Sequence, residues 1–539
     1  MSTLASQTSG MAVGTLLSRI TGIVRDIALV AAIGTGVFSD SYSVANSVPN
    51  IIYILIAGGA INAVFVPALV RHMNDDEDAG ARFADALLTI VSAVLFIVVL
   101  ITMAVAPFIA HLYGTSQWST QDFDVATYFA RWCLPQIFFY GLYTLASQVL
   151  NARGVFKLPM YAPIVNNVVV IATAGLFIAI STGEPTSATV LHKELFLLGF
   201  GTTLGVVVQA LILLPALGKA GYNFRPNFSV RGSGLGKVGD LAIWTIGFVF
   251  VNQLSFLVIS RLTTYANVVS TNAALTPVGF TSYQKAQLMM MLPHSIITVS
   301  LITAVLPRLS RQAHAHDEQA FDAELTHAVR LVMALMVPSA ALLVIAGPRI
   351  GQFLYGHGAS TLAQGNAVGF VSSMFAIGLP AFSLFYVLLR SFYARENTKT
   401  PFFINLAFNM IHVGVGTILF FFVADKYKVA SLAFAYSIGY TVVCLYTWNL
   451  LSRKQPGLRR GGHLQLLVRL SVATLVATFV AEIIMKVLPS ASAHTTIALL
   501  EQLIIMATSF IGSFFVIARA MHIDEVGTVL TSLMSRKGN

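Results

Sequence analysis

Residues 84–112 read ADALLTIVSAVLFIVVLITMAVAPFIAHL, and this stretch decides the class of fold. Asp85 is its one charged side chain, and a long apolar run follows it. That run exceeds the roughly 20 residues that a helix needs to cross about 30 Å of hydrocarbon. The stretch therefore predicts a membrane-spanning helix.

Thirteen further apolar runs occur along the chain, so we predict fourteen membrane-spanning helices. The runs cover residues 10–33, 41–69, 84–112, 124–150, 160–182, 194–218, 238–264, 275–306, 325–347, 365–392, 401–424, 429–451, 464–488 and 495–520. Only 10 % of the 539 residues are charged, whereas a soluble domain carries about 25 %. This composition predicts an all-α polytopic membrane protein and excludes a soluble enzyme, a disordered chain and, despite the net charge of +10, a nucleic-acid binder.

Basic residues collect in alternate connections between the runs, and this alternation predicts the orientation of the chain. The basic connections hold Arg71 and Arg82; Arg153 and Lys157; Lys219, Arg225, Arg231 and Lys237; Arg308 and Arg311; Arg395 and Lys399; and Arg453, Lys454, Arg459 and Arg460. Because basic connections stay in the cytoplasm, we expect both termini to be cytoplasmic.

Short motifs recur at nearly one spacing along the chain and indicate an internal repeat. The pattern A-R-x3-K-x-P begins at Ala152 and again at Ala394, and Leu-Tyr-Gly begins at Leu112 and again at Leu354. Pro67 and Arg71 recur as Pro307 and Arg311. The spacing covers an even number of runs, so the two copies have the same orientation in the membrane.

The repeat predicts two pseudo-symmetric six-helix lobes followed by two extra C-terminal helices. We expect helices 1–6 in residues 1–222, helices 7–12 in residues 223–455, and helices 13–14 with a cytoplasmic tail in residues 456–539. Two such lobes are typical of a secondary transporter that works by alternating access. The chain has no phosphate-binding loop of the G-x4-G-K-S/T type, and Cys133 and Cys444 have no metal-ligand spacing, so we predict no metal and no cofactor.

The first run contains two arginines that need a physical explanation. Each guanidinium inside a spanning helix costs about 2.5–3.5 kcal/mol if it faces lipid, so Arg19 and Arg25 are expected to face water, a partner or a ligand. One interpretation has Arg19 reaching the cytoplasmic interface and Arg25 paired with Asp40. The other is an anion site, because guanidinium groups bind phosphate oxygens in a bidentate manner.

The second run opens with Asp40, which we expect to cap that helix or to contribute to the site. Pro49 and Asn50 follow, and they predict a kink that frees backbone carbonyls toward a cavity.

Ser18-Arg19-x2-Gly22-x2-Arg25-Asp26, followed by Asp40, Pro49 and Asn50, resembles the signature of the MurJ (MviN) family of lipid II flippases. The resemblance is specific over residues 15–70 and continues collinearly to about residue 455. It implies the multidrug/oligosaccharidyl-lipid/polysaccharide (MOP) exporter fold and transfer of lipid II between the leaflets of the bacterial cytoplasmic membrane. By this resemblance Arg19, Arg25 and Asp40 match residues important for the family's function. We expect substrate contacts from Ser18, Arg19, Arg25, Asp40 and Asn50, and structural or gating roles for Gly22, Asp26, Pro49 and Pro293.

The chain departs from the family pattern at several positions. No arginine pair follows Asn50, and no arginine precedes Pro293, so Lys285 and Arg261 are the candidates for additional substrate contacts. The run 401–424 holds Asn405, Asn409 and His412 but no acid, which argues against a sodium site of the family type. We expect His294 and His412 to be hydrogen-bonded core residues.

The expected partners are lipid II, membrane lipids and, further afield, proteins of cell-wall synthesis or division. Two alternatives stay open: a flippase for another polyprenyl-pyrophosphate glycan, and a MATE-type drug antiporter. A cation exporter would favour acids in its cavity, whereas the first run offers arginines.

Overall fold

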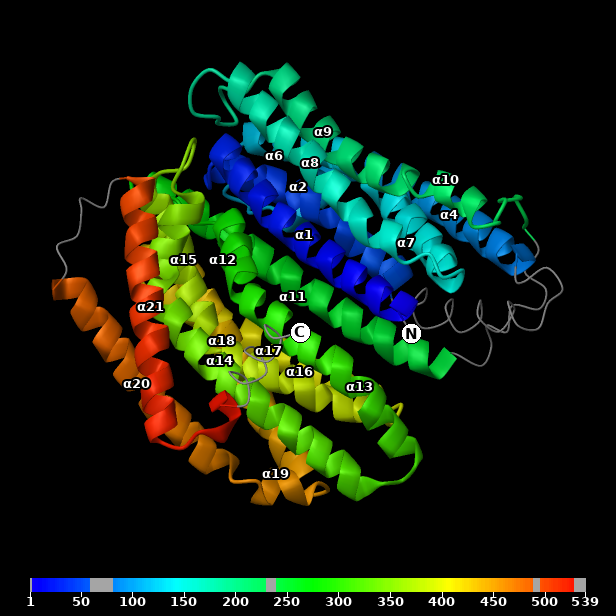
Figure 1. Ribbon diagram of the computed structural model, residues 1–539. Coiled ribbons are helices and arrows are strands. Elements are labelled where there is room, and N and C mark those ends of the chain that lie inside the picture. Colours follow the sequence, from blue (N-terminus) through cyan, green and yellow to red (C-terminus); the bar gives the residue numbers. More distant parts are fainter. Residues whose placement is uncertain (1, 59–80, 229–238, 488–494, 528–539) are drawn as a thin grey trace. The chain divides into compact units, whose positions relative to one another are not determined.

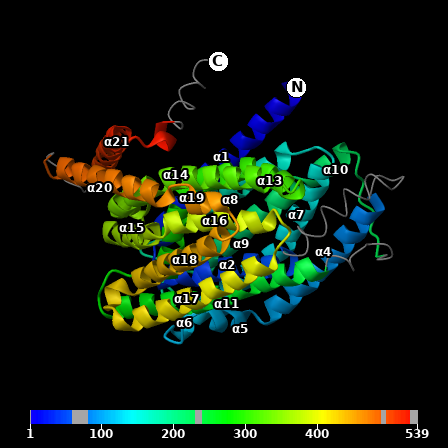
Figure 2. The ribbon, with the colours of Figure 1, turned by 90° about the horizontal axis from the view of Figure 1, so that it is seen from below.

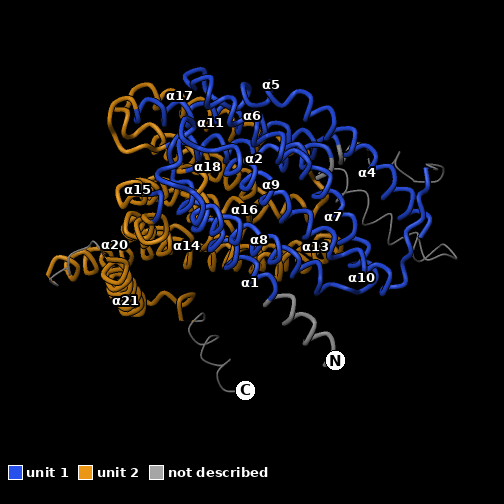
Figure 3. Tube along the Cα trace, turned by 90° about the horizontal axis from the view of Figure 1, so that it is seen from above, with its two compact units in different colours: residues 1–271, 279–281, 358–360 blue, residues 272–278, 282–357, 361–539 orange. Residues whose placement is uncertain are grey.

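The computed structural model describes residues 2–58, 81–228, 239–487 and 495–527, and these are helical with short connections (Figure 1). Pro67 and Arg71 of the predicted repeat lie outside the described residues. The chain divides into two compact units, which Figure 3 colours separately. The first comprises Met1–Thr271, Gly279–Thr281 and Gly358–Ser360, and the second comprises Asn272–Val278, Ser282–His357 and Thr361–Asn539.

The first unit holds the helices that carry most of the predicted site. They are α1 (Ser2–Ile33), α2 (Val37–Tyr53), the π-helix η1 (Ile54–Gly58), α4 (Ala81–Ala104), α5 (Ala106–Tyr113), α6 (Thr120–Cys133), α7 (Gln136–Ala152), α8 (Lys157–Ile180), α9 (His192–Leu211), α10 (Leu214–Lys219) and nearly all of α11 (Gly239–Asn272).

The second unit holds the remaining helices and, at its end, the pair α20 and α21, which lie side by side in Figures 1 and 2. Its elements are α12 (Phe280–Pro293, from residue 282 on), the π-helix η4 (His294–Thr298), α13 (Val299–His314), α14 (Glu318–Tyr355), α15 (Leu362–Ile377), α16 (Leu379–Tyr393), α17 (Lys399–Phe422), the 3-10 turn η5 (Asp425–Tyr427), α18 (Lys428–Ser452), α19 (Pro456–Arg460), α20 (His463–Val487) and α21 (Thr496–Ala520).

The predicted all-α polytopic fold is confirmed. Ten helices of the described residues are long and apolar enough to cross a membrane, and a bent pair, α15 with α16, makes an eleventh. Within the described ranges each predicted run falls on a helix or on a helix with a break, and the count of fourteen spans stays a prediction. The lobe boundaries at residues 222 and 455 stay predictions too.

Proline and glycine account for the breaks inside the spans. Pro135 separates α6 from α7, since a proline cannot donate a hydrogen bond to the preceding turn. Between α15 and α16 the chain bends by 49° at Gly378, whose backbone N–H finds the hydroxyl of Ser437 at 3.0 Å. Freed backbone groups therefore have protein partners, as an apolar environment requires.

The same local structures recur at the spacing of the sequence repeat. The helix α8 runs from Lys157 to Ile180, and α17 runs from Lys399 to Phe422, so both ends keep that spacing. Ser119 and Thr361 keep it too, and each forms a capping box at the start of α6 and α15. The two π-helices η1 and η4 begin at nearly the same spacing. The repeat seen in short motifs is therefore also a repeat of helix ends and helix irregularities.

Small residues allow a close contact between two helices of the second unit. Gly347 and Gly351 on α14 face Gly365 and Gly369 on α15, so both helices contribute a G-x3-G pair. A Cβ added at Gly351 would collide with the carbonyl oxygen of Gly365, and one at Gly369 with that of Gly347. Backbones approach this closely in membranes because dispersion contacts, rather than hydrophobic exclusion, hold the helices together.

We predict that Gly369→Leu destabilises the second unit by more than about 3 kcal/mol, because the collision is with backbone and overpacking of even a yielding site costs about 1–3 kcal/mol. The measurement is the thermal unfolding midpoint of the purified chain in detergent. Gly414→Leu on α17 is the matched control, because a Cβ there meets nothing within 4 Å. Equal midpoints for the two variants would contradict this account of the packing.

Candidate functional site

Arg25 on α1 carries a charge that its neighbours neutralise only in part. Its Nη2 lies 3.4 Å from Oδ1 of Asp26, and its Nη1 donates a hydrogen bond of 3.1 Å to Oδ1 of Asn167 on α8. The side chain of Arg25 is 33 % exposed, whereas that of Asp26 is 7 % exposed. The remaining N–H donors of the guanidinium have no partner among the described side chains and backbone, so the group can bind an anion without first breaking an ion pair.

Asn167 holds the turn of α1 that precedes Arg25. Its Nδ2 donates to the carbonyl oxygen of Ser18 at 3.1 Å and to Oγ1 of Thr21 at 2.9 Å. Because its Oδ1 accepts a hydrogen bond from Arg25, the single side-chain amide of Asn167 positions both this turn of α1 and the Arg25 guanidinium. Gly22 lies beside it, and an added Cβ would come within 3.7 Å of Nδ2, an ordinary contact. The sequence interpretation did not include Asn167, although Asn166-Asn167 interrupts an apolar run.

Arg19 lies on the same continuous helix, about one and two-thirds turns before Arg25. Its side chain is partly buried and makes no hydrogen bond or ion pair with the part of the chain that the structure describes. This separation corresponds to about 9 Å along a helix, so the two cations lie at two depths of α1.

A polar interior surrounds this part of the first unit. The hydroxyls of Tyr42 and Thr202 lie 2.7 Å apart. Nε2 of Gln136, a fully buried residue, donates to Oγ1 of Thr203 at 3.0 Å, and Tyr140 donates to its Oε1 at 3.1 Å. Buried polar groups in a membrane protein cost free energy unless they are satisfied, and these side chains satisfy one another across three helices.

Asp40 forms a separate network and does not pair with Arg25 among the described contacts. Its carboxylate is completely buried. Oδ2 accepts from Nδ2 of Asn267 at 2.7 Å and from the backbone N–H of Phe280 at 3.0 Å, and Oδ1 accepts from the backbone N–H of Thr281 at 2.8 Å. Asp40 therefore caps the N-terminus of α12, where the helix dipole favours a negative charge.

The expectation that Asp40 caps its own helix is wrong. The N-cap of α2 is Gly36, and Asp40 lies one turn inside that helix. The pattern could not reveal the distant partner, because the two segments are far apart in the sequence and meet only in the folded chain. Gly279 makes the approach possible, since an added Cβ would collide with Oδ2 of Asp40 and Nδ2 of Asn267.

A second segment packs on the same corner of the first unit. The backbone N–H of Ala359 donates to the carbonyl oxygen of Ala31 at 2.8 Å. Gly34 and Gly358 both have positive φ angles, of 68° and 67°, which non-glycine residues rarely adopt. Residues 279–281 and 358–360 come from the second copy of the repeat and belong to the first compact unit.

The remaining predicted site residues are not gathered around Arg25 by any described contact. Pro49 is buried inside α2, and Asn50 is exposed. Arg261 is exposed on α11. Lys285 and Pro293 belong to the second unit, where Pro293 ends α12 directly before η4.

The two buried histidines of the second unit lie among aromatic side chains. Nδ1 of His294 lies 2.9 Å from Oγ of Ser383, and Nε2 of His412 lies 3.4 Å from the hydroxyl of Tyr283. Both histidines are buried, as predicted for hydrogen-bonded core residues. Among the described residues, no group of three or more His, Cys, Asp or Glu side chains is placed to hold a metal ion.

A duplicated helical plan with irregular spans is typical of secondary transporters that work by alternating access. Comparison with known proteins then identifies the family. The family model "Lipid II flippase MurJ" matches residues 29–507, and the chain belongs to this family. The protein is thus a multi-pass protein of the inner membrane and a transporter rather than an enzyme.

Individual relatives agree with this assignment. The lipid II flippase MurJ of Burkholderia cenocepacia is 29 % identical over 393 residues, which cover 72 % of each chain. The probable lipid II flippase MurJ of Vibrio cholerae is 28 % identical over 508 residues, 92 % of this chain and 88 % of the relative.

Solved structures show the fold. A lipid II flippase MurJ in an inward closed conformation matches with a TM-score of 0.73 at 21 % identity, over 95 % of this chain and 99 % of the other. An inward-facing MATE family multidrug transporter of the MOP superfamily matches with a TM-score of 0.64 at 14 % identity, over 82 % and 96 %. The predicted MOP fold is confirmed.

We predict that Asp40→Asn loosens the start of α12, because an amide presents one acceptor oxygen where the carboxylate presents two charged ones. Hydrogen–deuterium exchange of the peptide that contains Phe280 and Thr281 should become at least about tenfold faster, since a hydrogen bond to a charged group contributes about 1.5–3 kcal/mol. Ser41→Ala is the control, because the Ser41 hydroxyl donates only to the carbonyl of Val37 in its own helix. Unchanged exchange in Asp40→Asn would refute the capping role.

Proposed function

We propose that this chain transfers lipid II from the cytoplasmic to the outer leaflet of the bacterial inner membrane, with both termini in the cytoplasm. The relatives' names supply the substrate, and the partly neutralised guanidinium of Arg25 is the observation that supports it in this chain. Lipid II carries its sugar–peptide head on a pyrophosphate, whose oxygens suit bidentate binding by arginine.

In this proposal, the pyrophosphate meets Arg19 and Arg25 in turn as it enters along α1. Arg25 keeps Asn167 as a hydrogen-bond partner and offers its uncommitted N–H donors to the phosphate oxygens. Ser18 lies one residue before Arg19 on that helix and contributes its hydroxyl. Asp26 limits the net positive charge of the empty site, so the headgroup does not bind irreversibly.

The cap on α12 acts as a latch in the cycle. Because residues 279–281 and 358–360 belong to the second copy of the repeat, alternating access requires their contacts with α1 and α2 to open and reform. Each hydrogen bond to the Asp40 carboxylate is worth about 1.5–3 kcal/mol, and binding of the headgroup at Arg25 offsets part of that cost. The role of Asp40 is thus conformational, because its carboxylate is sealed away from any ligand in this state.

The membrane potential supplies a driving force for an anionic headgroup. Moving two negative charges outward across about 100 mV yields roughly 4.6 kcal/mol, from about 2.3 kcal/mol per charge. The same field returns the emptied cationic site to the inside.

Export of organic cations, as in a MATE-type antiporter, fits the charges less well. It calls for accessible carboxylates, whereas the side chain of Asp26 is only 7 % exposed and Asp40 is completely buried. We further propose that the chain works beside proteins of cell-wall synthesis, which consume the flipped precursor.

The proposal predicts that Arg25→Ala lowers lipid II transfer at least about tenfold, since the lost bond is charge-assisted and worth about 1.5–3 kcal/mol. Arg25→Lys should retain part of the rate, because a lysine supplies the charge but not the bidentate geometry. The assay uses the full chain in vesicles with fluorescent lipid II and a quencher added outside.

Arg311→Ala is the matched control, because Arg311 is an exposed arginine whose Nε bonds only within its own helix. Gel filtration and circular dichroism of each variant establish that it is folded. Transfer by Arg25→Ala at the wild-type rate would refute the role of Arg25, and no transfer by the wild type would refute the proposed function.

A further inference from the structure

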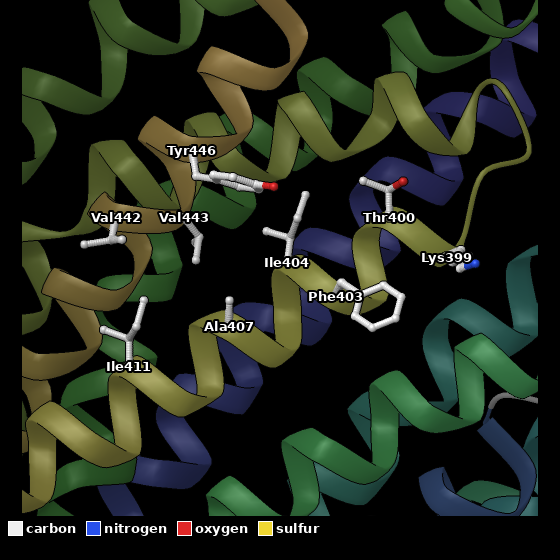
Figure 4. Close-up of a pocket in the computed structure, with 9 residues that line it drawn as sticks. All are labelled: Lys399, Thr400, Phe403, Ile404, Ala407, Ile411, Val442, Val443 and Tyr446. Carbon is white, nitrogen blue, oxygen red and sulfur yellow. The ribbon is translucent and has the colours of Figure 1, made fainter.

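A groove runs between α17 and α18 in the second unit (Figure 4). It has a volume of about 490 Å³ and is lined by Lys399, Thr400, Phe403, Ile404, Ala407, Ile411, Val442, Val443 and Tyr446. Lys399 is the one charged side chain of this lining, and it lies at the first residue of α17. The groove is thus an apolar trough with a cation at one end.

Large apolar side chains of the groove are open to their surroundings. Phe403 is 50 % exposed, Val442 is 44 % exposed and Tyr446 is 59 % exposed. On a helix pair that crosses a membrane, such surface faces acyl chains rather than water. The tyrosine near the charged end fits the interfacial belt, where an aromatic ring lies beside lipid and its hydroxyl reaches the headgroups.

Positive charge concentrates at the end of the groove that Lys399 marks. The helices α17 and α18 are joined by the short turn η5 and run antiparallel, so the end of α18 lies beside the start of α17. Arg453 and Lys454 follow α18 directly, and both are exposed. Lys399, Arg453 and Lys454 therefore lie at the same end of this helix pair, and we call this end the Lys399 rim.

The first copy of the repeat contains the helix α8, which corresponds to α17, but there the equivalent face of the helix is covered. Lys157 and Tyr161 on α8 correspond, at the spacing of the repeat, to Lys399 and Phe403 on α17. In the first unit α1 covers that face: Gly14 packs directly on the Tyr161 ring. The counterpart of α1 at that spacing is α11, which groups with the first unit.

We propose that this groove binds one anionic phospholipid, with an acyl chain along Phe403, Ala407 and Val442 and the phosphate on the Lys399 rim. Basic pockets between membrane helices recognise anionic headgroups in this way. Charge complementarity selects the anionic lipid over a zwitterionic one, while the apolar trough fits the chain of either. This binding does not depend on the proposed transfer of lipid II.

The test is native mass spectrometry of the full chain released from detergent, with dioleoyl-phosphatidylglycerol or dioleoyl-phosphatidylcholine added. The wild type should retain one phosphatidylglycerol more tightly than phosphatidylcholine. Lys399→Glu should lower the affinity for phosphatidylglycerol about fivefold or more, since a basic residue near the headgroups contributes about 1 kcal/mol and the reversal also adds repulsion. Ala407→Trp, which fills the trough, should weaken retention of both lipids.

Lys157→Glu is the matched control, because it reverses the corresponding exposed lysine where α1 covers the helix face. It should leave the preference for phosphatidylglycerol unchanged. Equal retention of the two lipids by the wild type would overturn the proposal, as would a Lys399→Glu variant that behaves like Lys157→Glu. If Ala407→Trp retained both lipids as the wild type does, the groove would be excluded as the lipid-binding site. Unfolding midpoints of all variants establish that each is folded.

Discussion

A positive charge held inside an apolar helix is the constraint on which the first unit is built. A guanidinium facing lipid at the middle of a span costs about 2.5–3.5 kcal/mol. Asp26 and Asn167 reduce that cost for Arg25, and Asn167 at the same time ties α1 to α8 through Ser18 and Thr21. These two partners use only part of the Arg25 guanidinium, so its remaining N–H donors are available to an anionic headgroup.

The two copies of the repeat share a backbone plan but differ in chemistry. Their π-helices, capping boxes and helix ends recur at the spacing of the sequence motifs. The first copy holds Arg25 beside Asp26 and Asn167 and contains a network of hydroxyls and amides, whereas the second packs aromatic rings around His294 and His412. The described contacts of the arginine thus lie in the first copy, and these ring contacts lie in the second.

Hydropathy alone predicts the class of fold, because a spanning helix must be predominantly apolar over about 20 residues. The site is less predictable. Arg25 was identified from the cost of burying its charge, but its partner Asn167 comes from a distant helix. The local pattern predicts that Asp40 caps its own helix. It cannot show that α12, which is distant in the sequence, begins against the Asp40 carboxylate. The π-helices escaped prediction because they depend on hydrogen-bond register, which side-chain pattern does not encode.

The central claim is that the guanidinium of Arg25 recognises a pyrophosphate. The most direct measurement compares the affinity of the purified chain for undecaprenyl pyrophosphate and undecaprenyl phosphate, with Arg25 intact and with Arg25→Gln. The account predicts that the wild type prefers the pyrophosphate by about tenfold or more, the factor that about 1.5–3 kcal/mol for a charge-assisted bond implies, and that Arg25→Gln loses this preference. A folded Arg25→Gln variant that keeps the full preference would contradict it.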